Sequence, residues 1–361
     1  MNPQFWRGKD VLVTGHSGFK GAWLCMLLHS LEARVAGYAL DPPTDPSLYE
    51  LARVDELVDS TVGDIRDLEA LSNRVRAFAP GVVFHMAAQS VVLRSYDDPV
   101  ETYSTNVLGT VHLLEAVRRM GRPCTVINVT TDKCYENEGR VSGYAEDATL
   151  GGRDPYSNSK ACAELVGNAY RASFFPLDRR YEHGVGLASA RAGNVIGGGD
   201  WTARQLVPDT IASFIESKAV VLRHPRAVRP WQHVLDCLSG YVTLAEALAG
   251  NVEAYSGGWN FGPTESDSRP VCDVVEALAA HWGTSVTWVK DAARHAPEEE
   301  ILRLDVTKAA KLLGWRSRLT IDDALRWVAH WYRDLNRGRD ARELCYEQID
   351  AYLQLGPRHA Q

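Results

Sequence analysis

The segment Tyr156-Ser157-Asn158-Ser159-Lys160 places a phenol and an ammonium group four residues apart. On a helix this spacing brings both groups to one face. A nearby ammonium and a cationic nicotinamide ring would lower the pKa of the phenol from its usual value of about 10. We therefore predict that Tyr156 takes the proton of a substrate hydroxyl while hydride leaves the same carbon atom. Taken alone, the pair is equally compatible with an uncoupled surface tyrosine and lysine.

A glycine-rich turn near the N-terminus complements this pair. It is Thr14-Gly15-His16-Ser17-Gly18-Phe19-Lys20-Gly21, between an apolar segment and a helical pattern, which is the context that dinucleotide binding requires. Gly15 permits the tight turn, Gly18 lets the backbone approach a phosphate, and Gly21 allows close helix packing. The helix N-terminus then faces the pyrophosphate. Together the two motifs predict redox chemistry on an alcohol, whereas the turn alone could be a plain strand–helix connection.

An acidic residue favours NAD over NADP as the cofactor. Asp41 follows Gly21 by about 20 residues, where a carboxylate accepts hydrogen bonds from the ribose diol and repels a 2′-phosphate. An aspartate that only shapes a turn is the alternative. Asp64 and Ile65 are expected beside the adenine. The predicted cofactor contacts are Gly15, Ser17, Gly18, Phe19, Gly21, Asp41, Asp64, Ile65, Ala87, Ala88, Gln89, Asn106, Tyr156 and Lys160.

The segment Thr130-Thr131-Asp132-Lys133-Cys134-Tyr135 is a second candidate centre, directly after an apolar stretch. Thr131 can hydrogen-bond the same oxygen as Tyr156, and Asp132 is a candidate general acid. An aspartate that caps the next turn is the alternative for Asp132. The predicted catalytic residues are Thr131, Asp132, Lys133, Tyr156 and Lys160.

These motifs lie between segments that alternate between strand and helix patterns. Strands are predicted at 10–14, 34–40, 61–64, 81–86, 123–130 and 185–190. Helices are predicted at 19–31, 68–78, 99–119 and 156–172, the first of them amphipathic. This alternation predicts an α/β fold with a doubly wound parallel sheet of the Rossmann type, which binds ligands at the carboxyl ends of its strands.

The last third of the chain changes character. Residues 194–201 are expected to form a glycine-rich loop, 220–223 and 259–263 short strands or loop anchors, and 307–313 and 321–337 helices. We therefore predict a NAD-binding Rossmann domain over 1–193 and a smaller C-terminal substrate-binding lobe over 194–361. A segment around 225–250 is expected to return to the first domain.

The composition argues against several classes of function. The chain has 361 residues, a net charge of −7 and a pI of about 5.9, which disfavours nucleic acid or an anionic membrane as a partner. We expect a cytoplasmic protein, since no signal-peptide pattern and no membrane-spanning stretch are found. The seven cysteines lack CxxC or CxxH spacing, so free thiols and no metal site are expected.

The longer motifs resemble a known family. The glycine-rich turn, the Tyr–Lys pair and Arg191-Ala192-Gly193-Asn194-Val195-Ile196-Gly197 are similar to the extended short-chain dehydrogenase/reductases. The Thr131-Asp132 pair is similar to the nucleotide-sugar 4,6-dehydratases among them. The resemblance runs over about 9–332 and is closest to members that act on CDP-glucose. The segments that carry it are 15–21, 132–137, 189–201 and Arg229-Pro230-Trp231-Gln232-His233-Val234.

The resemblance implies a reaction on the glucose of a CDP-sugar. NAD would oxidise the 4-hydroxyl, and the resulting ketone makes the C5 proton acidic. That proton and the 6-hydroxyl would leave as water, with Asp132 as the acid, and hydride would return to C6. The implied product is CDP-4-keto-6-deoxy-glucose, with NAD regenerated.

Lys133 departs from the pattern of the family. Many members carry Asp-Glu here, and the glutamate acts as the C5 base. A lysine must be neutral to act as a base, and shifting its pKa from about 10.4 to near 7 costs roughly 4–5 kcal/mol. We predict that Lys133 is this base or orients another, with Glu136 and Tyr135 as further candidates. It could instead only organise the loop.

A nucleotide diphosphate requires fixed positive charge. Arg204 and Arg229 are the best candidates, because a guanidinium binds phosphate through two hydrogen bonds. Asn194 is expected to bind a phosphate or sugar oxygen, and Val207 to frame the base together with 220–222. The resemblance assigns cytosine, a choice that side-chain chemistry leaves open.

Other functions are compatible with parts of the pattern. A 4-epimerase would share the Tyr–Lys pair and the cofactor but needs no acid at C6, so Thr131-Asp132 argues against it. A 4,6-dehydratase with another nucleotide hexose is a further alternative. A non-enzymatic redox sensor would need neither Tyr156 nor Lys160. By resemblance, helices 99–119 and 156–172 pair in a homodimer or homotetramer.

Overall fold

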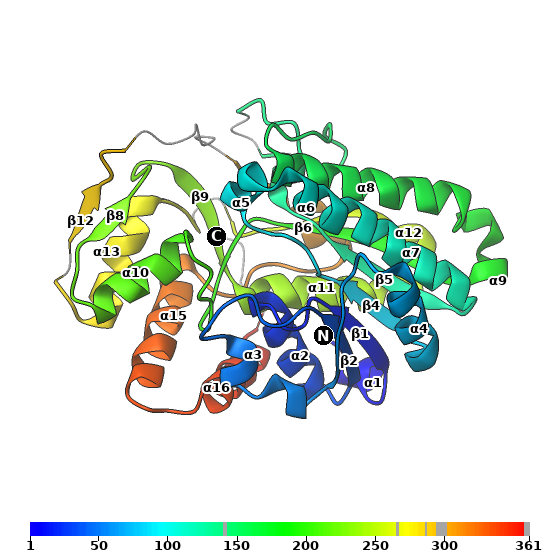
Figure 1. The fold of residues 1–361 in the computed structure, drawn as a ribbon, viewed down its shortest axis with the longest axis horizontal. Coiled ribbons are helices and arrows are strands. Elements are labelled where there is room, and N and C mark those ends of the chain that lie inside the picture. The colour runs from blue at the N-terminus through cyan, green and yellow to red at the C-terminus, as the bar shows by residue number, and fades with distance from the viewer. Residues whose placement is uncertain (140–142, 265–266, 286, 294–301, 357–361) are drawn as a thin grey trace.

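A seven-stranded parallel sheet lies at the centre of the computed structural model (Figure 1). Its order is β10-β6-β5-β4-β1-β2-β3. The strands are β1 (Asp10–Thr14), β2 (Arg34–Ala39), β3 (Asp59–Val62), β4 (Val82–His85), β5 (Cys124–Val129), β6 (Val185–Ala192) and β10 (Gly257–Phe261). β4, β5 and β6 are buried along their whole length, as expected for parallel strands covered on both faces. The predicted doubly wound α/β fold is confirmed.

The structure describes residues 1–139, 143–264, 267–285, 287–293 and 302–356. Parts of the predicted C-terminal lobe, namely 265–266, 286, 294–301 and 357–361, therefore lie outside the described residues.

Helices cover both faces of the main sheet (Figure 1). α4 (Leu68–Phe78), α7 (Gly109–Met120) and α8 (Pro155–Ser173) lie on one face, and α2 (Phe19–Ser30) and α11 (Val234–Gly250) on the other. α11 contacts β5 and β6, so the segment expected to return to the first domain packs on the main sheet. The boundary at residue 193 stays a prediction.

α2 differs from the amphipathic helix that its sequence predicted. Residues 21–28 are all buried, because α2 packs on the sheet and is also contacted by its neighbour α11 and by α16 (Ala341–Gln354). A helix that is enclosed on every side needs no polar face.

Several other elements also differ from the prediction. The helix expected at 99–119 consists of α6 (Pro99–Tyr103), a π-helical turn at Ser104–Leu108, and α7. β3 begins before the predicted residue 61, and the loop expected at 194–201 begins with β7 (Asn194–Ile196). β10 joins the edge of the main sheet instead of the lobe, because it pairs in parallel with β6.

The C-terminal lobe contains two small sheets. β7, β9 (Val228–His233) and β11 (Ser268–Pro270) form one, and β8 (Val220–Leu222) and β12 (Trp288–Lys290) form the other. The longer helices there are α10 (Leu206–Ile215), α13 (Val271–Trp282) and α15 (Ile321–Asn336). Besides α6, the short α-helices among the described residues are α1 (Pro3–Trp6), α3 (Leu48–Leu51), α5 (Val92–Asp97), α9 (Arg180–His183), α12 (Val252–Tyr255) and α14 (Thr307–Leu312). Of the helices described, none is both long and apolar enough to cross a membrane.

Candidate active site

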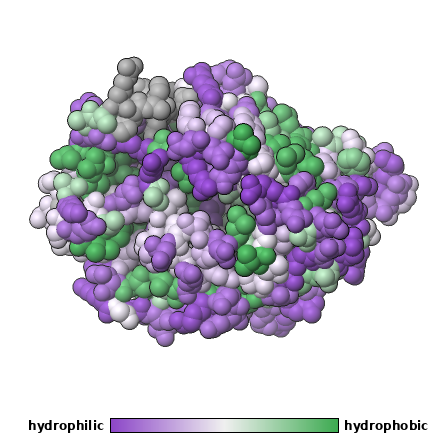
Figure 2. Space-filling view, in the orientation of Figure 1, coloured by the Kyte–Doolittle hydropathy of each residue, from purple (hydrophilic) through white to green (hydrophobic). Residues whose placement is uncertain are grey.

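A cavity of about 1790 Å³ lies at the carboxyl edge of the main sheet and extends into the lobe. Figure 2 shows a hollow near the centre of this face, bordered largely by hydrophilic residues. Pockets for one small ligand usually measure roughly 300–1,000 Å³, so this cavity has room for a dinucleotide and a second ligand. The predicted residues that line it are Gly15, Ser17, Gly18, Phe19, Gly21, Asp41, Asp64, Ile65, Ala87, Ala88, Gln89, Thr131, Lys133, Tyr156, Lys160, Asn194, Arg204 and Arg229.

The glycine-rich turn packs directly against the strand ends. Gly15 has a φ of +75°, and a Cβ atom there would lie 2.7 Å from the backbone nitrogen of Ala87. A Cβ atom on Gly21 would lie 2.1 Å from the carbonyl oxygen of Gly15. Gly18 caps α2 without a side-chain hydrogen bond, so the N–H groups of the first turn face the cavity uncapped. This cradle fits the pyrophosphate of NAD.

Two carboxylates lie where the adenosine end of a dinucleotide would reach. Asp41 is exposed at the cavity wall beyond β2, and the Ser17 hydroxyl holds the turn to this strand end by donating to the Leu40 carbonyl at 2.7 Å. Asp64 is instead paired with Arg66 at 2.5 Å, and these hydrogen bonds lower the pKa of Asp64. The place of Asp41 at the cavity wall is compatible with the predicted contact to a ribose diol, which stays a prediction.

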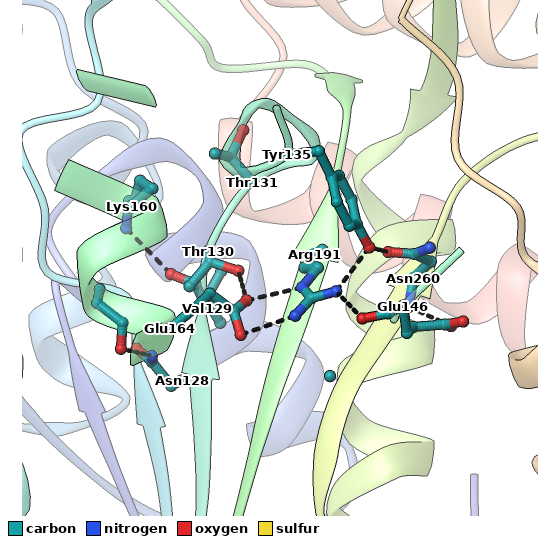
Figure 3. Close-up of polar contacts among 12 residues, drawn as sticks. Asn128, Val129, Thr130, Thr131, Tyr135, Glu146, Lys160, Glu164, Arg191 and Asn260 are labelled. Carbon is teal, nitrogen blue, oxygen red and sulfur yellow. Dashed lines mark hydrogen bonds and ion pairs between the residues drawn. The ribbon is translucent and has the colours of Figure 1, made fainter. Parts of the chain in front are cut away.

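The Tyr–Lys pair lies in the first turns of α8. Asp154 caps this helix by accepting from the backbone nitrogen of Ser157 at 2.9 Å, and Pro155 occupies its first position, where its missing N–H costs nothing. Tyr156 and Lys160 are both buried and both line the cavity. Lys160 Nζ donates to the carbonyl oxygen of Val129 at 3.0 Å (Figure 3).

Burial is the main influence on the pKa values of this pair. Burial, assisted by the charge of Lys20, lowers the pKa of Lys160 to about 8. Burial raises the pKa of Tyr156, and the charge of Asp132 adds to this, while a hydrogen bond with Thr131 acts in the opposite direction. Without a cofactor, burial therefore dominates the pKa of Tyr156. The lowering expected from Lys160 together with a bound nicotinamide stays a prediction.

The loop after β5 brings Thr131 and Lys133 to the cavity but not Asp132. Thr131 caps a 3₁₀ turn at Asp132–Cys134, and its hydroxyl donates to Asp132 Oδ1 at 3.0 Å. Lys133 Nζ lies 3.5 Å from the same oxygen. Asp132 is fully buried because the turn directs its side chain toward Gly193, so it reaches the cavity only through Thr131 and Lys133.

Tyr135 is not suited to act as the C5 base. Its hydroxyl accepts from Arg191 Nη1 at 2.6 Å and donates to Asn260 Oδ1 at 2.7 Å. Burial raises its pKa, although Arg191 opposes this. The ring lines the cavity, but the hydroxyl is occupied behind the wall. Glu136 also lines the cavity and stays a candidate.

Two other predicted contacts lie behind the wall. Asn106, predicted to bind the cofactor, is turned inward by the π-helical turn; it bonds the backbone of Gln89 and the hydroxyl of Ser159. It therefore positions the loop that carries Gln89. Val207, predicted to frame the base, faces the core of the lobe from the start of α10, and its neighbour Leu206 lines the cavity instead.

The lobe end of the cavity is rich in arginine. Arg204 and Arg229 line it as predicted, and Arg223 does so as well, with its Nη2 donating to the carbonyl of Arg204 at 3.1 Å. The sequence offered a signal for Arg223, since it directly follows the segment 220–222. Asn194 also lines the cavity as predicted, and its Oδ1 is buried and accepts no hydrogen bond from the described residues.

The described part of the chain contains no candidate metal-binding cluster. No group of three or more His, Cys, Asp or Glu side chains there could hold an ion. All seven cysteines are described, and each is a free thiol, as expected.

Comparisons with known proteins agree with this geometry. The family model described as GDP-mannose 4,6 dehydratase matches residues 12–328. A CDP-glucose 4,6-dehydratase of Salmonella typhimurium is 48% identical over 353 residues, which cover 98% of both chains.

Solved structures show the same architecture. A dTDP-glucose 4,6-dehydratase of Streptomyces venezuelae with NAD bound is 26% identical, with a TM-score of 0.75 over 91% of this chain and 98% of that one. A UDP-glucose 4-epimerase of Thermus thermophilus in complex with NAD is also 26% identical, with a TM-score of 0.74 over 90% and 98%. Because both activities occur on this fold, the fold alone does not select between them.

Proposed function

Since the chain belongs to the family described as GDP-mannose 4,6 dehydratase, we propose that it is a NAD-dependent hydro-lyase that converts CDP-glucose into CDP-4-dehydro-6-deoxy-glucose. The observation that carries the choice of substrate is the similarity to the Salmonella CDP-glucose 4,6-dehydratase along the whole chain. The cavity supports it, because one space joins the glycine-rich turn, the Tyr–Lys pair and three arginines.

Tyr156 and Lys160 act at the C4 hydroxyl. Bound NAD supplies the oxidation of C4 and the later reduction of C6. Tyr156 accepts the proton of the C4 hydroxyl, and Thr131 hydrogen-bonds the same oxygen. Lys160, with a pKa of about 8, is charged at neutral pH. Its positive charge favours the phenolate form of Tyr156 during the reaction.

The loop after β5 acts in the elimination. Once C4 is a ketone, a base removes the C5 proton, and the C6 hydroxyl leaves with one proton as water. We propose that Lys133 serves as this base or orients it, and that Asp132 supplies the proton through Thr131 or Lys133, which separate it from the cavity. The return of hydride to C6 and of a proton to C5 completes the product.

Replacing Lys133 with alanine is expected to slow the exchange of the C5 proton with solvent by about a hundredfold, since a general base typically contributes 10²–10⁴-fold. Deuterium incorporation from heavy water, followed by mass, measures it. Lys290→Ala is the matched control, because Lys290 is exposed on β12. Undiminished exchange in the Lys133 variant would exclude Lys133 from this step.

The substrate is tested by incubating the pure protein with NAD and, separately, CDP-, dTDP-, GDP- and UDP-glucose. Loss of one water from CDP-glucose alone is the expected result. Water loss from another nucleotide sugar would show that the enzyme prefers a different nucleotide. An unchanged mass with an altered sugar configuration would identify an epimerase. No change with any of the four would overturn the proposal.

We further propose that the protein is a cytoplasmic homo-oligomer. α6 to α8 expose apolar side chains that a partner subunit would cover, including Val100, Leu108 and Leu165, which are 77%, 52% and 54% exposed. Light scattering coupled to size-exclusion chromatography distinguishes a monomer, a dimer and a tetramer.

A further inference from the structure

A buried ion pair lies behind the cavity wall, between β6 and α8 (Figure 3). Arg191 Nε and Nη2 donate to the two carboxylate oxygens of Glu164 at 2.9 and 3.0 Å, and the side chains are only 4% and 1% exposed. Thr130 Oγ1 donates to Glu164 Oε1 at 2.6 Å. The pair thus joins the end of β5, the catalytic helix and β6.

The hydroxyl of Tyr135 extends this network to the catalytic loop. It accepts from Arg191 and donates to Asn260, whose amide nitrogen donates to the carbonyls of Tyr144 and Asp305 at 2.8 and 3.0 Å. Figure 3 shows this hydroxyl pointing away from the Lys160 side of the site and toward Arg191 and Asn260. Two strands of the main sheet, β6 and β10, therefore fix its position.

Tyr135 directly follows the 3₁₀ turn that contains Asp132 and Lys133. The tyrosine is buried, and Tyr144 stacks on its ring at 5.4 Å. The Tyr135 hydroxyl thus gives this part of the loop a side-chain link to the sheet. Lys160, by contrast, is held by Val129, a bond in which Tyr135 takes no part.

We propose that Tyr135 is a positioning residue for the elimination, separate from the groups that serve the oxidation. Its hydroxyl holds the loop so that Asp132 and Lys133 lie correctly for the substrate. The Tyr156–Lys160 pair keeps its position when this hydroxyl is removed. This inference rests on the proposed function and divides the reaction between two structural units: α8 for C4 and the loop after β5 for C5 and C6.

The variant Tyr135→Phe removes only the hydroxyl. Arg191 keeps both bonds to Glu164 and a third to the carbonyl of Glu146 at 2.9 Å, so the buried charge stays paired. Tyr352→Phe is the matched control, because its hydroxyl is equally buried and bonds Asp236 and Ser239 at a distance from the cavity.

The test follows both steps with CDP-glucose and NAD in heavy water. Absorbance of the reduced nicotinamide in the first turnover reports oxidation, and deuterium at C5 with mass loss reports elimination. In Tyr135→Phe we expect elimination to slow by at least about tenfold and oxidation to stay within about twofold, so that the 4-keto-glucose nucleotide accumulates. The Tyr352 control should change neither step.

Equal loss of both rates, or an unchanged elimination rate, would overturn the positioning role. Should Tyr135→Phe fail to fold, as judged by thermal unfolding, Arg191→Lys tests the same link. Lysine keeps the charge beside Glu164, but its single nitrogen cannot replace the separate nitrogens with which Arg191 bonds Glu164 and Tyr135. Failure of the proposed function is distinguishable, because the unaltered protein would then form no dehydrated product.

Discussion

Replacing Tyr156 with phenylalanine is expected to lower kcat by about 10³-fold with CDP-glucose. The reason is that Tyr156 is a buried phenol on the cavity wall, and in the proposed reaction it accepts the C4 proton. The aromatic ring remains in the variant, so substrate binding should change much less than turnover. Product formation under saturating substrate measures the loss, and KM reports binding separately.

The matched control for this variant is Tyr181→Phe, which removes a hydroxyl from a side chain that is 84% exposed on α9. It should retain full activity. If Tyr156→Phe kept kcat within about tenfold of the unaltered protein, the proton would have to leave through another group, and Thr131 would be the next residue to examine.

Replacing Glu164 with glutamine is expected to lower the free energy of unfolding by about 3–5 kcal/mol. The change leaves the Arg191 guanidinium buried without its counter-charge, and an uncompensated buried ion costs far more than a lost surface pair. Chemical denaturation at neutral pH measures the difference. Catalysis should fall as well, because Glu164 belongs to α8, the helix that carries Tyr156 and Lys160.

Glu115→Gln on α7 makes the same chemical change in a different environment. Glu115 pairs with Arg118 and Arg119, which are 44% and 47% exposed, so its loss should cost under about 1 kcal/mol. Equal losses for the two variants would show that burial does not set the strength of the Glu164 pair.

The contribution of Glu164 also depends on pH. Burial opposes its charge, but the hydrogen bonds and charge of Arg191 outweigh this and hold its pKa below the ordinary value. The unfolded chain therefore binds a proton at higher pH than the folded one. The stabilisation is fully present above about pH 4.3 and is lost as the pH falls through the folded pKa. The difference between the unaltered protein and the variant should shrink in acid.

The motifs of the catalytic pair and the glycine-rich turn could be read directly from the sequence. Tyr156 and Lys160 lie in one helix, and Gly15 and Gly21 lie in one strand–helix connection. Local sequence patterns were therefore sufficient to predict where these residues lie relative to each other. The alternation of strands and helices likewise predicted the sheet, because each element carries its own apolar period.

What the sequence did not predict depends on contacts between distant segments. Asp132 is buried because the 3₁₀ turn that contains it packs against Gly193. Asn106 points inward because it lies in a π-helical turn, which has no clear sequence signal. The enclosure of α2 requires α16, which comes from the far end of the chain. The link from Arg191 to Tyr135 joins residues in different elements.

The placement of β10 and α11 has a consequence for how the protein can be divided. Both come from the second half of the chain, yet β10 completes the sheet that carries the glycine-rich turn, and α11 packs on that sheet. The indole of Trp23 in α2 also donates to the carbonyl of Gly198 at 2.8 Å. A fragment that ends near residue 193 would expose an unpaired β6 edge and the apolar surface of α2. The two halves are therefore not modules that can be excised or exchanged, and the chain should unfold as one cooperative unit.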